Sequence, residues 1–232
     1  LGMGDLNYLT MSEESDQEYC AAQVRSYDYE RYFAAVLGDE ALRRGLFALY
    51  AFNLELAGLK ERVTEPLIGE MRLQWWRDTL EGIYRGSVRD HAVTNELARA
   101  IERFSLDRTS LEWMVNGRTL DLSEDPPNSL NVLEEYVTAT AGQIMVNACI
   151  ICGDSLERSD ALSLGKYWGL TGLIRSLQHD LGQRRVFLPS VLMRQIDLHP
   201  DELLDSEQSA KVTHIVESLA KTFCLNDIIF PY

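Results

Sequence analysis

The sequence predicts an all-α protein that folds as a single domain. Apolar residues recur at three- and four-residue intervals along most of the 232-residue chain, which is the spacing of a helix face. We find no convincing strand, no glycine-rich phosphate loop and no cluster of zinc ligands. A composition of 46% hydrophobic and 25% charged residues is ordinary for a soluble globular protein. We therefore expect about eight or nine helices packed around one core.

Charge and hydropathy narrow the choice of partners. The net charge of −14 argues against nucleic acid, and against a general attraction to anionic membranes. The longest apolar stretch, residues 144–152, is short and is interrupted by Asn147, whereas a membrane-spanning helix needs about 20 residues. We expect no transmembrane segment and a cytoplasmic location, with peripheral contact to a membrane left open.

The four cysteines are expected to be reduced thiols. Cys149 and Cys152 have the spacing of a redox motif, but they sit in an apolar helical run without a second pair or a nearby histidine. This setting favours buried packing over metal binding or redox chemistry. The other two cysteines are Cys20 and Cys224.

Residues 1–27 are expected to be a flexible lead-in, and residues 28–232 the folded domain. The chain begins at Leu1, and Met11 has the character of a natural start, so residues 1–10 could be vector-derived or upstream sequence. The acidic, polar segment 12–18 predicts a frayed end.

Five helices are predicted before the clearest loop. The helix at 40–63, which Asp39 can cap, is apolar on nearly every side and should therefore be central. Thr64 should cap the next helix, which places Pro66 in the first turn and runs to Tyr84. The predicted ranges are 28–37, 40–63, 64–84, 93–104 and 107–122.

Polar residues on the central helix need partners, because a buried carboxylate is costly unless it is paired or hydrated. Asn53 and Glu55 interrupt its apolar surface. For Glu55 we favour a buried pair or a cavity wall. Glu61 lies near the helix end, where a solvated position is the simpler interpretation.

The loop 123–128, with its two prolines, is the best candidate for an internal boundary. The helix predicted at 130–152 carries four polar residues at spacings of four, three and four, on an otherwise apolar surface. Because buried amides must be satisfied, this stripe suggests a cavity or a file of water molecules. Its members are Tyr136, Thr140, Gln143 and Asn147.

A helix with small residues on one face follows, from about residue 156. Gly165, Gly169, Gly172 and Ser176 recur at helical spacing, and glycine inside a helix costs about 1 kcal/mol against alanine. The cost is understandable if a neighbouring helix or a bound chain approaches closely. The sequence does not distinguish a neighbouring helix from a bound chain at this face. The stripe leads to a polar end suited to an anionic head group, formed by His179, Asp180, Gln183, Arg184 and Arg185. After Pro189 we expect a short helix and a last amphipathic helix to about Cys224.

Several segments together resemble the squalene/phytoene synthase family over most of residues 29–198. They are 49–52 (LYAF), 73–77 (LQWWR), Gly117-x-x-x-Asp121-Leu122, Tyr136 to Gly142, and the ungapped run 170–189. The resemblance implies an isoprenoid synthase fold, a helical bundle around a central apolar cavity. It also implies two Asp-x-x-x-Asp motifs on facing helices, whose Mg²⁺ ions bind the diphosphates of two prenyl chains.

This sequence departs from both motifs. The first aligns with Ala57 and Glu61, and the second aligns with Ser176 and Asp180, so each has lost its leading acid. Arginines near the second motif could still hold one phosphate through paired hydrogen bonds. The expected remnants of the metal and diphosphate site are Glu61, Arg175, His179, Asp180, Arg184 and Arg185. The expected cavity lining is Asn53, Glu55, Tyr136, Thr140, Gln143, Asn147, Gly169, Gly172 and Ser176.

In three shorter segments the sequence is most similar to one branch of the family, which contains a mitochondrial complex I assembly factor and its bacterial relatives. This branch is regarded as non-enzymatic. The similarity rests on 51–57 (AFNLELA), on 64–69 (TEPLIG) and on 71–76 (MRLQWW). It implies a fold retained for binding after the metal chemistry was lost.

Two functions compete. The first is a non-catalytic, assembly-type factor that needs no cofactor and binds a partner protein, a lipid or an isoprenoid. The second is an active head-to-head prenyl transferase that uses Mg²⁺ at Glu61 and Asp180, with Arg175 and Arg185 on the diphosphate and Tyr136 near the cation. A lyase or hydrolase with His179 as its base is a third, weaker reading.

Overall fold

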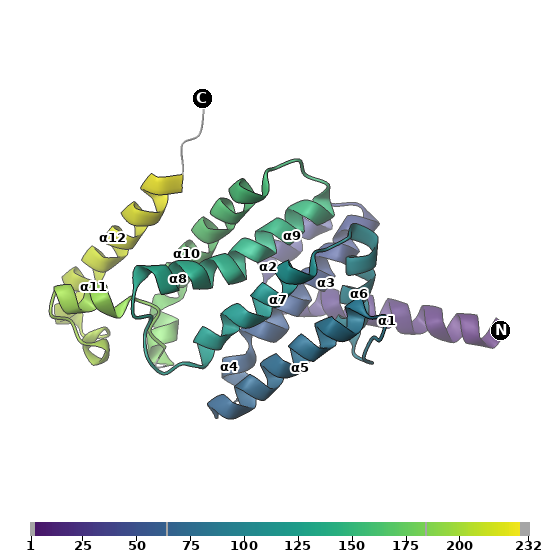
Figure 1. The fold of residues 1–232 in the computed structure, drawn as a ribbon, viewed down its shortest axis with the longest axis horizontal. Coiled ribbons are helices and arrows are strands. Elements are labelled where there is room, and N and C mark those ends of the chain that lie inside the picture. Colours follow the sequence, from purple (N-terminus) through teal and green to yellow (C-terminus); the bar gives the residue numbers. More distant parts are fainter. Residues whose placement is uncertain (1–2, 64, 184, 228–232) are drawn as a thin grey trace.

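The computed structural model describes residues 3–63, 65–183 and 185–227, with side chains omitted for residues 3–14, 60 and 224–227. Within these ranges every regular element is helical, so the all-α prediction is confirmed (Figure 1). The first half contains α1 (Met3–Tyr27), α2 (Tyr29–Val36), α3 (Glu40–Ala57), α4 (Leu59–Arg62), α5 (Pro66–Tyr84), α6 (Ala92–Phe104), α7 (Arg108–Gly117) and the 3₁₀ turn η1 (Arg118–Leu122).

The second half contains one long bent helix and a terminal group of shorter ones. The bent helix comprises α8 (Leu130–Val137), the π-helical segment η2 (Thr138–Gly142) and α9 (Gln143–Cys152). It is followed by α10 (Arg158–Gly182), α11 (Ser190–Gln195) and α12 (Ser209–Asp227), with 3₁₀ turns at Pro200–Glu202 and Ser206–Gln208. Figure 1 places α11 and α12 at the end of the molecule opposite the N-terminus of α1. No helix among the described residues is long and apolar enough to cross a membrane.

Helix α3 is central, as its sequence predicts. Its middle is buried on all sides, and it packs against α1, α6 and α9. Asp39 caps its start by accepting a hydrogen bond from Leu42 N at 2.9 Å. The prediction of one helix over 40–63 is wrong at its end, because α3 stops at Ala57 and the chain turns at Gly58 into α4. The predicted cap Thr64 lies outside the described residues.

The prediction of a flexible lead-in over residues 1–27 is wrong for its second part. Residues 15–27 belong to α1, which packs on α3 and α6. Cys20 and Val24 are completely buried in the core, and Asn95 Nδ2 donates to Asp16 Oδ2 at 2.9 Å. Two buried side chains in a polar segment were too weak a signal for sequence reasoning.

The core has two parts that meet along the bent helix. The first part joins α1, α3, α5, α6 and α7 with α9, and the second joins α8, α10, α11 and α12. Leu133 and Val137 of α8 lie in the second part, whereas Ile144 and Ile151 of α9 lie in the first. The loop 123–128 therefore precedes a helix that spans both parts of the core.

The small-residue stripe of α10 divides into a packed part and an open part. A Cβ atom on Gly165 would lie 2.6 Å from both Ala141 O and Gly142 Cα, and one on Gly169 would lie 2.7 Å from Ala141 Cβ. These glycines let α10 lie directly on η2. A Cβ on Gly172 would meet no described atom within 4 Å. Tight helix packing thus accounts for the first two glycines and leaves Gly172 facing open space.

Candidate functional site

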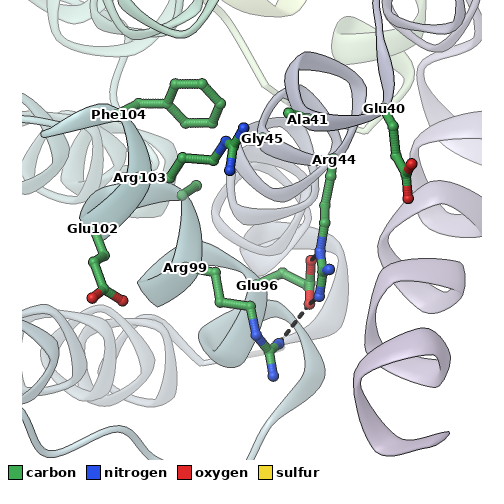
Figure 2. Close-up of a pocket in the computed structure, with 10 residues that line it drawn as sticks. Glu40, Ala41, Arg44, Gly45, Glu96, Arg99, Glu102, Arg103 and Phe104 are labelled. Carbon is green, nitrogen blue, oxygen red and sulfur yellow. Dashed lines mark hydrogen bonds and ion pairs between the residues drawn. The ribbon is translucent and has the colours of Figure 1, made fainter. Parts of the chain in front are cut away.

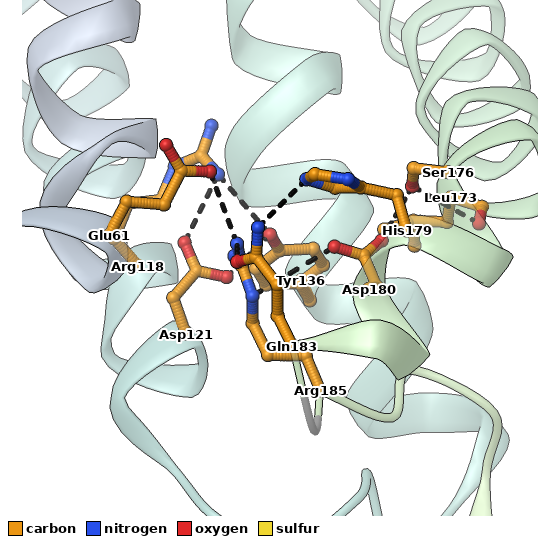
Figure 3. Close-up of polar contacts among 10 residues, drawn as sticks. All are labelled: Glu61, Arg118, Asp121, Tyr136, Leu173, Ser176, His179, Asp180, Gln183 and Arg185. Atoms are coloured by element: carbon orange, nitrogen blue, oxygen red, sulfur yellow. Dashed lines mark hydrogen bonds and ion pairs between the residues drawn. The ribbon is translucent and has the colours of Figure 1, made fainter.

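A set of polar side chains converges from η1, α8, α4 and the C-terminal end of α10 (Figure 3). We call it the polar cluster. It has two halves, one built on Arg118 and the other on Arg185. Its members are Glu61, Arg118, Asp121, Tyr136, Ser176, His179, Asp180, Gln183 and Arg185.

The first half is a buried network around Arg118. Its guanidinium donates to Asp121 Oδ2 at 3.1 Å, to the Tyr136 hydroxyl at 3.2 Å and to Asn53 Oδ1 at 2.9 Å. The Tyr136 hydroxyl in turn donates to Asp121 Oδ1 at 2.7 Å. Both Asp121 oxygens are therefore engaged, and the Asp121 side chain is only 3% exposed.

Electrostatics keep the phenol of this network protonated. Burial raises the pKa of Tyr136 far above its ordinary value, and the negative charge of Asp121 raises it further. The charge of Arg118 works in the opposite direction but does not prevail. Burial by itself would lower the pKa of Arg118, but Tyr136 and Asp121 raise it overall. A neutral Tyr136 and a charged Arg118 are thus the stable forms.

The second half surrounds Asp180 and Arg185. Ser176 Oγ donates to Asp180 Oδ2 at 2.6 Å, and Arg185 Nε forms an ion pair with Asp180 Oδ1 at 3.9 Å. The Arg185 guanidinium also donates to Glu61 Oε1 at 3.2 Å, which links α10 to α4. At the edge of the cluster, Gln183 Nε2 lies 3.0 Å from His179 Nε2.

The structure brings together many of the residues expected from the sequence. Seven of them lie in the cluster or bond to it: Asn53, Glu61, Tyr136, Ser176, His179, Asp180 and Arg185. Arg175 instead forms an exposed ion pair with Glu30 of α2 at 3.2 Å. Glu55 pairs with Arg62 at 2.9 Å, in a contact that is exposed rather than buried as predicted. Arg184 lies outside the described residues.

The remaining polar stripe residues are hydrogen-bonded to one another and to α7. Ser110 Oγ donates to Gln143 Oε1 at 2.7 Å and accepts from Asn147 Nδ2 at 2.7 Å. Thr140 Oγ1 donates back to Tyr136 O at 2.7 Å, within the π-helical stretch. Direct helix–helix bonds thus satisfy much of the stripe. Gln143 Nε2 and Asn147 Oδ1 are buried without a partner among the described residues.

Sequence reasoning missed Arg118 and Asp121 as site residues. Asp121 does belong to the Gly117-x-x-x-Asp121 motif, and that motif was the available signal. The partners of Arg118 lie 18 residues away at Tyr136 and 65 residues away at Asn53, so only the fold shows the network.

A groove of about 860 Å³, lined by both apolar and polar side chains, adjoins the first half of the cluster. We call it the α7–α8 groove. Trp113 and Leu120 line it from α7 and η1, and Val132 and Ala139 line it from α8 and η2. Tyr136 belongs both to this groove and to the polar cluster.

A second pocket, of about 590 Å³, lies between α3 and α6 (Figure 2). Its central charges compensate one another: Arg44 donates twice to the buried Glu96, at 2.6 and 2.8 Å, and Arg99 donates to the same carboxylate at 2.6 Å. These contacts account for the carboxylate and indicate no particular ligand.

The acids of the polar cluster are each engaged by another side chain of the protein. Magnesium prefers several carboxylate and water oxygens in octahedral geometry. Each acid here is already bonded to a guanidinium or a hydroxyl group, and the described residues contain no grouping of three or more His, Cys, Asp or Glu side chains that could hold a metal. Ala57 and Ser176 stand where the resemblance implies the two leading acids.

Comparison with known proteins places the chain in a family. The squalene/phytoene synthase family model matches residues 24–223. The chain is 30% identical over 204 residues to NADH dehydrogenase (ubiquinone) complex I, assembly factor 6, of Homo sapiens, covering 87% of this chain and 61% of that protein. It is 23% identical over 208 residues to 15-cis-phytoene synthase of Synechocystis, covering 84% of this chain and 61% of that one.

The fold agrees with these matches. A crystal structure of a dehydrosqualene synthase superposes with a TM-score of 0.79 at 20% identity, over 92% of this chain and 75% of that one. This likeness shows the isoprenoid synthase fold. The chain spans about 61% of the length of both curated relatives named above. From the family match and the fold, the chain belongs to the squalene/phytoene synthase family.

Proposed function

We propose that this chain is a non-catalytic member of its family, an assembly-type factor that acts by binding. The observation that carries the proposal is the pairing of every acid in the polar cluster with a side chain of the protein. Arg118 and Tyr136 hold Asp121, Ser176 and Arg185 hold Asp180, and Arg185 also holds Glu61.

This pairing opposes the binding of a metal–diphosphate cluster. To ligate Mg²⁺, Asp180 would have to give up its ion pair with Arg185, at 3.9 Å, in which the side chains are only 9% and 12% exposed. Breaking a buried pair in this way leaves an uncompensated charge, which is strongly unfavourable. The guanidiniums of Arg118 and Arg185 thus supply positive charge beside the acids, where metal ions would otherwise supply it.

Two observations support a binding role. Relatives of about 30% identity carry the name of a complex I assembly factor, which motivates a protein partner. The α7–α8 groove offers a surface of mixed polar and apolar side chains to such a partner, or to an isoprenoid or lipid chain, next to the polar cluster. Because the chain spans only part of those relatives, the partner itself is left unnamed.

The competing function is an active prenyl transferase. The observation in its favour is that Glu61, Asp180 and Arg185 lie within one ion-pair network, as a reduced metal and diphosphate site would require.

Diphosphate release separates the two functions. The protein is offered farnesyl or geranylgeranyl diphosphate with Mg²⁺ and then with Mn²⁺, and its helical circular dichroism confirms that it is folded. We expect no release above that of Asp180→Ala, because the acids are already paired. Metal-dependent release that disappears in Asp180→Ala would establish the transferase and overturn the proposal.

A further inference from the structure

A pocket of about 290 Å³ lies where α3, α4, α5 and the segment preceding α6 meet. Its lining residues are Glu55, Leu59, Arg72, Trp75, Trp76 and His91. None of them belongs to the polar cluster or to the α7–α8 groove. The inference drawn from this pocket is therefore independent of the proposed function.

Three aromatic rings that line the pocket contact one another edge to face. The Trp75 and Trp76 ring centroids are 4.9 Å apart with an interplanar angle of 86°. The His91 ring lies 6.0 Å from Trp75 at 73° and 6.2 Å from Trp76 at 89°. Trp76 is anchored in the core by an edge contact with Phe52 at 5.1 Å, so these rings have a rigid base.

This arrangement attracts cations. The face of an indole carries partial negative charge, and aromatic cages recognise quaternary ammonium groups. The Arg89 guanidinium carbon lies 5.1 Å from the Trp75 ring centroid, so a ligand cation would need the opposite face of this ring or would have to displace Arg89. The carboxylate of Glu55 adds a formal negative charge to the lining, and Arg62 bonds only one of its two oxygens.

Arg72 provides positive charge at the edge of the pocket. Arg72 is exposed, and among the described residues it makes no hydrogen bond or ion pair. A free guanidinium suits a phosphate group, which it can hold through two parallel hydrogen bonds. His91 Nδ1 is buried without a partner among the described residues and offers a further polar contact. The pocket thus combines a cation site with an anion site.

An apolar stripe leads from the pocket along α5. Ile68 and Met71 precede Arg72 and Trp75 at the spacing of one helix face. Met71 is 65% exposed and Ile68 is 41% exposed, and the neighbouring Leu67 is 69% exposed. Exposed apolar side chains beside a polar pocket are what a membrane interface would bury.

We propose that this pocket binds the phosphocholine head group of a membrane lipid. The quaternary ammonium would lie against the aromatic rings beside Glu55. The phosphate would bind Arg72, and the acyl chains would lie towards Ile68 and Met71. A quaternary ammonium donates no strong hydrogen bond, so ring faces and one carboxylate suit it better than they suit a primary amine. A zwitterionic head group also avoids the repulsion that the net charge of −14 imposes on anionic lipids.

Calorimetric titration with phosphocholine and with choline tests the two halves of the pocket separately. Trp75→Ala should weaken the binding of both ligands about tenfold or more, because it removes a wall of the cation site. Arg72→Gln should weaken phosphocholine by a similar factor but leave choline unchanged. The control variants are Arg85→Gln, just beyond the other end of α5, and Trp168→Ala, a more exposed indole on α10. Neither control should alter either affinity.

Flotation with vesicles identifies the source of the head group. Vesicles of phosphatidylcholine should recruit the protein, free phosphocholine should compete, and vesicles of phosphatidylethanolamine or phosphatidylglycerol should recruit less.

The absence of saturable phosphocholine binding, or equal losses in the control variants, would overturn the proposal. Phosphocholine binding without vesicle recruitment would refute the lipid source. Tighter binding of a trimethyl-lysine peptide would assign the pocket to a protein ligand instead. Because Arg72 is exposed, its variant keeps the test valid if Trp75→Ala fails to fold.

Discussion

Arg118→Met is expected to lower the free energy of unfolding by about 3–5 kcal/mol, the typical cost of removing one partner from a buried ion pair. Methionine fills a similar volume but leaves Asp121 buried, with only the Tyr136 hydroxyl as a partner. It also removes the donor to Asn53 Oδ1, a bond that joins η1 to α3. Urea unfolding followed by circular dichroism measures the change.

Two further variants show whether the loss of stability comes from the buried ion pair between Arg118 and Asp121. Arg108→Met removes an exposed i, i+4 pair with Glu112, and such surface pairs contribute little, so its unfolding midpoint should match the wild type. Adding Asp121→Asn to Arg118→Met should restore part of the loss, because the two side chains are directly coupled. A loss below about 1 kcal/mol for Arg118→Met would contradict the buried network.

Gly165→Ala should destabilise the protein by about 1–3 kcal/mol, the usual range for overpacking. The new methyl group would lie 2.6 Å from two backbone atoms of η2, and backbone cannot move aside as a flexible side chain can. Gly172→Ala on the same helix meets no described atom within 4 Å and should stabilise the protein by up to about 1 kcal/mol, through helix propensity. Urea midpoints of the two variants provide the comparison.

The test is that Gly165→Ala should lower the free energy of unfolding whereas Gly172→Ala should raise it. If both alanines stabilise the protein, α10 does not lie directly on η2, and the close approach inferred for Gly165 is wrong. If both destabilise it, Gly172 does not face open space. Either result would change how the small-residue stripe of α10 is divided.

The sequence predicted the helices well wherever a periodic apolar face is buried. Helix α3 is the clearest case, because an apolar surface on every side can only be central. The same reasoning failed at Gly58, where one small residue ends α3 before Glu61. It also failed at α1, where Cys20 and Val24 are buried in the core and Ala21 packs against it.

Part of the site could be predicted because some of its contacts join residues that are close in the sequence. Ser176 and Asp180 are one helical turn apart, and their hydrogen bond follows from that spacing. Other contacts depend on packing: Glu61 and Arg185 are 124 residues apart, and Ser110 supplies partners to Gln143 and Asn147 from another helix. A stripe of polar residues cannot reveal from sequence whether it faces a cavity or a neighbouring helix.

The central claim is that guanidiniums already supply positive charge beside the acids of the polar cluster. The most direct test is the melting temperature of the protein with Mg²⁺ and inorganic pyrophosphate, each alone and both together. A ligand at 100 times its Kd would add about 2.7 kcal/mol of stability, and each kcal/mol raises Tm by about 2–4 °C in a domain of this size. We expect no change in Tm beyond the scatter of replicates. A rise of several degrees that requires both components and is lost in Asp180→Ala would contradict the claim.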